Sequence, residues 1–105
     1  SALDASVTGG NNTAIGKQAL TALTSGSSNT SVGFDSLAAT TTGADNIGIG
    51  NKSLFTNSTG SNNVAIGVSA LRNSTGDDNT AIGRSVMFAN TSGTSNVALG
   101  KGVFK

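Results

Sequence analysis

The sequence contains no cysteine, proline, histidine, tryptophan or tyrosine. Without cysteine it has no disulfide framework, and without cysteine or histidine it lacks the usual ligands of zinc, copper and iron. We therefore expect no metal site and no other cofactor. Only four of the 105 residues are aromatic, and many of the apolar residues are alanine, so a conventional hydrophobic core would be thin.

Charge is equally scarce. Six basic and five acidic residues give a formal net charge of +1, which is too weak and too scattered to direct the chain toward nucleic acid or an anionic membrane. No apolar run approaches the roughly 20 residues that a bilayer span requires. We expect neither a nucleic-acid partner nor membrane insertion.

Glycine, serine, threonine and asparagine are abundant, and they recur with a period. One glycine series advances in steps of 17, 17, 17, 16 and 17 residues, and such self-similarity is the signature of a repeat architecture. This series is Gly9, Gly26, Gly43, Gly60, Gly76 and Gly93. An asparagine series follows the same steps, at Asn12, Asn29, Asn46, Asn63, Asn79 and Asn96.

The repeat unit reads G-x-x-N-x-[AGS]-[IVL]-G-x-x-[ASV]-[LMF], followed by residues that are mainly Ser, Thr, Asn and Ala. We number the places of each unit from its first glycine. The single step of 16 arises between Leu71 and Gly76, so we predict a loop there. Helical-pair and propeller repeats need about 33 to 50 residues, whereas 17 residues suit one coil of a β-solenoid. We predict an all-β parallel β-helix or β-roll that forms a single domain over residues 1–105.

Each unit predicts short strands and tight corners. In "NTAIG" and "NVAIG" large and small residues alternate, which is typical of a strand with two faces. The flanking asparagine and glycine tolerate the left-handed backbone of a corner. We expect a second short strand over "KQAL", "FDSL", "NKSL" and "VSAL".

Stacked coils place equivalent side chains in ladders about 4.8 Å apart, so six coils would form a rod about 30 Å long. We expect the asparagine series to combine turn formation with an amide ladder. Two apolar ladders should fill the coil, while the small residues of the sixth place, beside the first ladder, let a neighbouring chain approach. The first ladder is Ile15, Val32, Ile49, Ile66, Ile82 and Leu99. The second is Leu20, Leu37, Leu54, Leu71, Met87 and Phe104.

The stretches "NTAIGKQALTALTSG", "NVAIGVSALRNSTG" and "NTAIGRSVMFANTSG" resemble the 17-residue repeats of bacteriophage and large-virus fibre proteins. Those repeats often precede an endosialidase-type intramolecular chaperone. A more distant resemblance is to the head repeats of trimeric autotransporter adhesins, whose period is nearer 14. The resemblance implies a homotrimeric rod on a virion that takes part in host attachment through a surface glycan or protein receptor. It also implies that the chain is a fragment of a longer fibre, with an adhesin head as the alternative.

Candidate binding residues lie at the ninth place, which varies between basic, amide and apolar residues and should face solvent. We expect Phe34 to be the best single candidate, with Lys17, Arg84 and Lys101 forming a dilute basic row. Solvated charges that prevent aggregation are the alternative interpretation of that row.

We expect no enzymatic activity. Glycan-cleaving enzymes use paired carboxylates, but Asp45 and Asp78 lie in turns, where aspartate is common for backbone reasons. A threonine-rich solenoid also suggests ice binding, which requires a regular rank of threonine pairs. The fifth place is mixed, however, because it reads Thr13, Thr30, Ile47, Val64, Thr80 and Val97.

Overall fold

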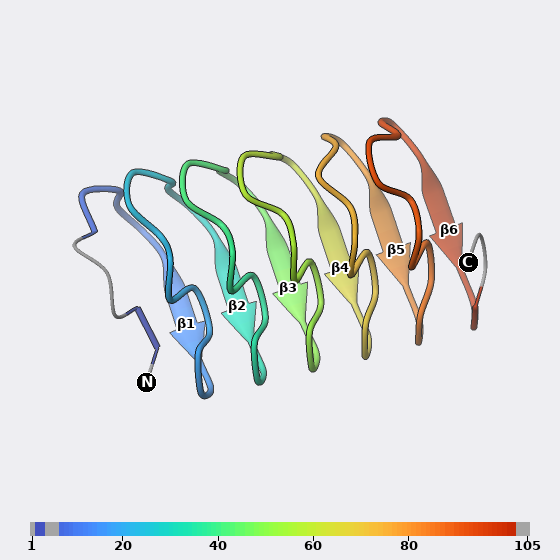
Figure 1. The fold of residues 1–105 in the computed structure, drawn as a ribbon, viewed down its shortest axis with the longest axis horizontal. Helices are drawn as coiled ribbons and strands as arrows, with labels where there is room; N and C mark the ends of the chain where they lie inside the picture. The colour runs from blue at the N-terminus through green and yellow to red at the C-terminus, as the bar shows by residue number, and fades with distance from the viewer. Residues whose placement is uncertain (1, 4–6, 103–105) are drawn as a thin grey trace.

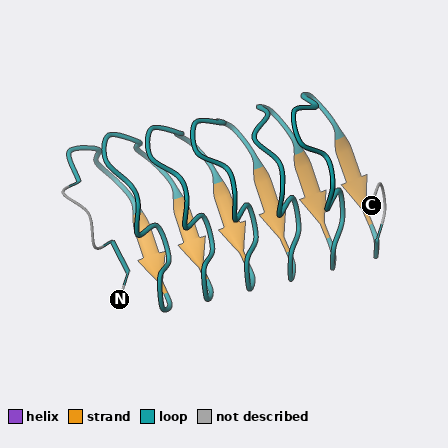
Figure 2. Cartoon of the chain, in the orientation of Figure 1, coloured by secondary structure: helices purple, strands orange, loops and turns teal. Residues whose placement is uncertain are grey.

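The computed structural model describes residues 2–3 and 7–102. These residues form six three-residue strands in one parallel sheet, with the strands in chain order (Figures 1 and 2). The strands are β1 Thr13–Ile15, β2 Thr30–Val32, β3 Ile47–Ile49, β4 Val64–Ile66, β5 Thr80–Ile82 and β6 Val97–Leu99. The predicted all-β solenoid is confirmed, and its dimensions of 35 × 23 × 17 Å describe a short rod.

The strands pair so that each place of the unit lies beside the same place in the next coil. Thr13 pairs with Thr30, and Val64 pairs with Thr80 although the coil between them is one residue shorter. The shorter coil therefore absorbs its deletion outside the strands. Residues 72–75 contain no strand, so the predicted loop between Leu71 and Gly76 is confirmed.

The asparagine ladder runs the length of the rod beside the sheet. Asn46 is fully buried; its Oδ1 accepts a hydrogen bond from the backbone N–H of Asn63 at 3.0 Å. Its Nδ2 donates to the carbonyl of Gly60 at 2.8 Å. The backbone N–H of Asn46 donates in turn to Oδ1 of Asn29 at 3.0 Å. Each asparagine thus joins two coils, so the predicted amide ladder is confirmed. The left-handed backbone expected at these asparagines lies instead at the third place, as in Asn11 with a φ of 62° and Asp45 with a φ of 58°.

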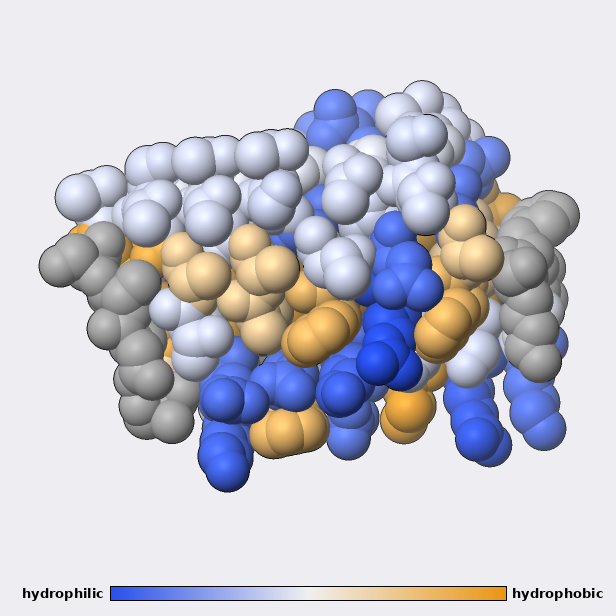
Figure 3. Space-filling view, in the orientation of Figure 1, coloured by the Kyte–Doolittle hydropathy of each residue, from blue (hydrophilic) through white to orange (hydrophobic). Residues whose placement is uncertain are grey.

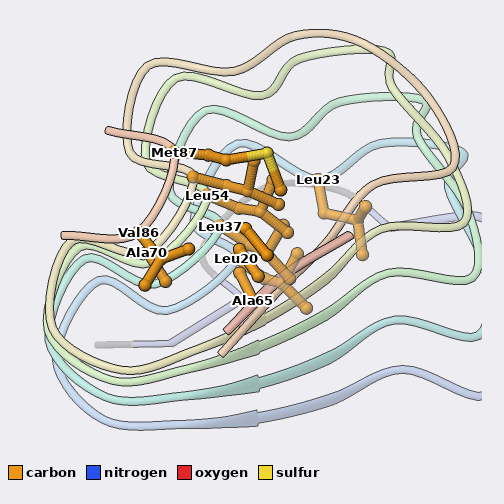
Figure 4. Close-up of a cluster of buried hydrophobic side chains, with 11 residues drawn as sticks. Leu20, Leu23, Leu37, Leu54, Ala65, Ala70, Val86 and Met87 are labelled. Atoms are coloured by element: carbon orange, nitrogen blue, oxygen red, sulfur yellow. The ribbon is translucent and has the colours of Figure 1, made fainter. Parts of the chain in front are cut away.

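The core lies between the sheet and the return segment, which we define as places nine to seventeen of each coil. Four leucines and a methionine of the twelfth place stack there without exposure to solvent (Figure 4). They are Leu20, Leu37, Leu54, Leu71 and Met87. Phe104, the last member predicted for this ladder, lies outside the described residues.

The predicted second strand is wrong. Residues 17–22 and their equivalents in coils two to five form turns, because two residues of each of these return segments have left-handed backbones. Gln18 has a φ of 63° and Leu20 a φ of 52°, and neither value is compatible with an extended strand. A left-handed leucine costs roughly 1–2 kcal/mol, which burial of its side chain offsets by about 1.5–3 kcal/mol.

The strands also present the opposite face to the core from the one expected. The small sixth-place residues are turned inward, and Ala65 and Ala81 are fully buried. The large seventh-place residues are turned outward: Ile15 is 59% exposed and Leu99 is 63% exposed. The expectation that the Ile15, Val32, Ile49, Ile66, Ile82 and Leu99 ladder fills the coil is therefore wrong, although the ladder itself exists.

The narrow interior explains this reversal. A Cβ atom added to Gly48 would lie 2.8 Å from Ser36 Oγ, 3.0 Å from Ser53 Oγ and 3.2 Å from Leu37 Cγ. Ser36 and Ser53 belong to the opposite wall, and Ser36 Oγ donates to the carbonyl of Gly48 at 2.8 Å. The return segment therefore leaves room for only a small side chain on the inner face of the strand, so the large residues face outward.

Candidate functional site

The outer face of the sheet is the most distinctive surface of the molecule. Both outward rows, at the fifth and seventh places, consist of threonine, valine, isoleucine and leucine without any charged residue. Ile47 is 36% exposed, Ile49 37%, Ile82 40% and Val97 71%. Because the strands are parallel and in register, the seventh place forms a straight apolar row along the rod and the fifth place forms a parallel row in which threonine is interspersed with apolar residues.

This exposed apolar strip is a candidate association surface. Soluble monomers rarely present contiguous apolar patches of large size, and such patches commonly mark interaction sites. The strip is formed by all six strands and covers one broad side of the rod. The expectation that small residues line the contact with a neighbour is wrong, since those residues are enclosed in the coil.

The ninth-place residues form a second exposed row along the edge where the strands end. Glycines of the eighth place, with φ between 118° and 131°, turn the chain at this edge. A Cβ atom on Gly50 would approach the Gly67 carbonyl oxygen to 2.6 Å. The turn therefore requires glycine both for its positive φ and because a Cβ atom would not fit. The predicted exposure is confirmed for every member: Lys17, Phe34, Asn51, Val68, Arg84 and Lys101.

The structure brings only some of the predicted binding residues together. Arg84 and Lys101 line one hollow of about 300 Å³ with Ser85 and Gly102. Phe34 is 40% exposed but belongs to the second coil, three coils before Arg84. A binding role for this row stays a prediction.

A cluster on the return segment was not predicted as a site. The Arg72 guanidinium lies 5.7 Å from the ring centroid of Phe55 and 5.5 Å from that of Phe88. Lys52 Nζ lies 5.1 Å from the Phe55 centroid. The repeat period is the sequence signal that could have revealed this cluster, because the thirteenth place of three successive coils holds Phe55, Arg72 and Phe88. We call these three stacked residues the column.

The acidic residues form no comparable cluster. Within residues 2–3 and 7–102, no three acidic residues gather as a metal site would require. Asp45 and Asp78 are both exposed and lie at the third place two coils apart. The same described residues contain no helix of a length and apolarity that would cross a membrane.

Comparison with protein-family models, curated proteins and solved structures finds no match to this chain. The fold and the chemistry of the exposed surfaces are therefore the basis for a functional proposal.

Proposed function

We propose that the chain is a shaft segment of a trimeric viral attachment fibre. The observation that supports this proposal is the uncharged apolar strip on the outer face of the sheet, where Ile15 and Leu99 at opposite ends are both well exposed. Association of chains through this strip removes it from water, and each large side chain that becomes fully buried contributes about 1.5–3 kcal/mol.

The mechanism is mechanical. Backbone hydrogen bonds and the asparagine ladder join every coil to the next, as in Thr30 N–H to the Asn46 carbonyl at 2.8 Å. A stack of this kind transmits force along its axis and presents variable residues at fixed intervals on its edges.

The oligomeric state in this proposal is a homotrimer located on the virion. The apolar strip supports self-association, and the number three comes from the resemblance to trimeric fibre repeats. Three strips facing a common axis would leave the ninth-place row and the return segments in solvent. Those surfaces would then be available to a host glycan or protein receptor.

Charge placed in the strip tests this proposal. We expect Ile49→Lys combined with Ile66→Lys to lower the mass measured by light scattering to that of one chain, because six ammonium groups would meet at the axis. Val68→Lys is the matched control, since Val68 is a 48% exposed apolar residue on the edge rather than the sheet face. An assembly that survives the double substitution would contradict the proposal.

The ice-binding alternative depends on the same face. Threonine occupies the fifth place in only three of the six coils, and the seventh place has none. The face therefore lacks the ranks of threonine pairs on which that function depends. A thermal-hysteresis measurement checks this point, and we expect no hysteresis.

A further inference from the structure

The column formed by Phe55, Arg72 and Phe88 consists of large side chains at a place where the stacking of coils does not require them. In the first two coils the thirteenth place holds Thr21 and Ala38, and the ladder continues there without bulky side chains. Coils three to five place three large residues there in direct succession. All three are half-buried, so their outer atoms remain accessible.

The two rings hold the Arg72 guanidinium between them. Distances of 5.7 and 5.5 Å to the ring centroids lie within the range of cation–π attraction. Lys52 Nζ lies 5.1 Å from the Phe55 ring centroid and so adds a second cation beside the column. A guanidinium held in this way loses little side-chain entropy when its N–H groups bind a ligand, and those groups match an oxyanion in bidentate geometry.

Three of the acidic residues lie away from this column. Asp45, Asp77 and Asp78 occupy the second and third places, before the strand, whereas Lys52 and Arg72 occupy the tenth and thirteenth places after it. Asp35 is the exception, because it occupies the tenth place of the second coil, next to Lys52 in the third coil. Arg72 lies two coils from Asp35 and is therefore the cation of the column that is separated from the carboxylates.

From this geometry we infer that the column binds an acidic saccharide, with Arg72 pairing with a carboxylate or sulfate group. Phe55 and Phe88 fix the guanidinium and offer apolar edges to the sugar, and Lys52 binds a second acidic group or a hydroxyl. The face in Figure 3 is close to neutral in hydropathy in its upper part and strongly hydrophilic in its lower part, with apolar residues between them. Serine, threonine and asparagine predominate in the return segments. Such hydroxyl and amide groups suit the hydroxyls of a sugar.

A polysaccharide fits this surface better than a nucleic acid does. Nucleic-acid binding depends on many phosphate contacts, whereas the column and Lys52 supply two cations in a chain of net charge +1. The return segments also lie across the core from the sheet (Figures 1 and 4). The proposed site is therefore independent of the association strip, and it is testable whether or not the chains associate.

Calorimetric titration with a heparin-derived hexasaccharide tests the inference, with maltohexaose as the neutral probe. We expect Arg72→Gln to weaken binding about tenfold or more, because it removes charge-assisted hydrogen bonds. Arg72→Lys, which keeps the charge but loses the planar fork, should weaken it about threefold or more. Phe88→Leu should also weaken binding, since it removes one ring and keeps an apolar side chain.

Lys17→Gln is the charge-matched comparison, because Lys17 lies in the first coil, three coils from Arg72. An equal loss in Lys17→Gln and Arg72→Gln would show that general charge attraction explains the binding, and would overturn the inference. Binding of maltohexaose or of a hexathymidylate as tightly as the acidic hexasaccharide would overturn it as well, as would no binding of the acidic probe. Circular dichroism of each variant separates loss of binding from loss of fold.

Discussion

Removal of one rung of the asparagine ladder tests the energetics of the solenoid. In Asn46→Ala three hydrogen bonds disappear: two to Oδ1 from Asn63, at 3.0 Å from the backbone N–H and 3.1 Å from Nδ2, and one from Asn46 Nδ2 to the Gly60 carbonyl at 2.8 Å. Two of the three former partners keep another bond. Asn63 Nδ2 still donates to the Gly76 carbonyl at 2.9 Å, and the Gly60 carbonyl still accepts from Asn57 at 3.0 Å.

The backbone N–H of Asn63 is the group that loses its partner, and Asn63 is fully buried. An unsatisfied buried N–H costs about 1–3 kcal/mol, and each further bond lost costs about 0.5–1.5 kcal/mol. We therefore expect Asn46→Ala to lower the free energy of unfolding by about 2–6 kcal/mol, which corresponds to a fall in Tm of about 10 °C or more.

Urea denaturation at one fixed protein concentration measures this change, with Asn51→Ala as the control. Asn51 has the same side chain but is exposed on the ninth-place edge, so its substitution should change stability by less than about 0.5 kcal/mol. Equal stability of the two variants would refute the argument that the ladder holds the coils together.

Three further substitutions test the packing. Gly50→Ala should destabilise the fold by at least about 2 kcal/mol in urea denaturation, because φ is 128° and Cβ would meet the Gly67 carbonyl; Gly10→Ala, with open space around its Cβ, should be nearly neutral. Ala81→Leu should destabilise by about 1–3 kcal/mol or more through overpacking, whereas Thr80→Leu on the outer face should leave the fold intact by circular dichroism. Leu54→Ala should cost about 2–5 kcal/mol in the same denaturation assay, and a smaller loss would show that the twelfth place is not the core.

The period alone was sufficient to predict the solenoid, because stacking requires each place to suit the same place above and below it. The positions of β1 and the roles of Asn12 and Asn29 followed from that constraint, since Asn29 N–H donates to Asn12 Oδ1 at 2.9 Å. The exposure of Lys17 and Phe34 also followed, because the ninth place holds side chains too different to share an interior.

The sequence did not predict which face of each strand is turned toward the core. Alternation separates Ala14 from Ile15 but does not say which faces inward, and hydrophobicity alone favoured the isoleucine. The deciding factor is the width of the interior, which the return segment sets by bringing Ser36 close to the strand at Gly48. The left-handed backbone of Leu20 could not be predicted from the sequence either, because leucine rarely adopts this conformation and its local preference is for an extended chain.

Small-angle X-ray scattering combined with light scattering on the wild-type chain tests the central claim most directly, because it reports mass and length together. We expect a particle of about 31 kDa, three times the 10.2 kDa of one chain, with a length close to the 35 Å of a single solenoid. Chains packed side by side through their sheet faces give this result. A particle of one chain's mass, or a rod about three times as long, would contradict it.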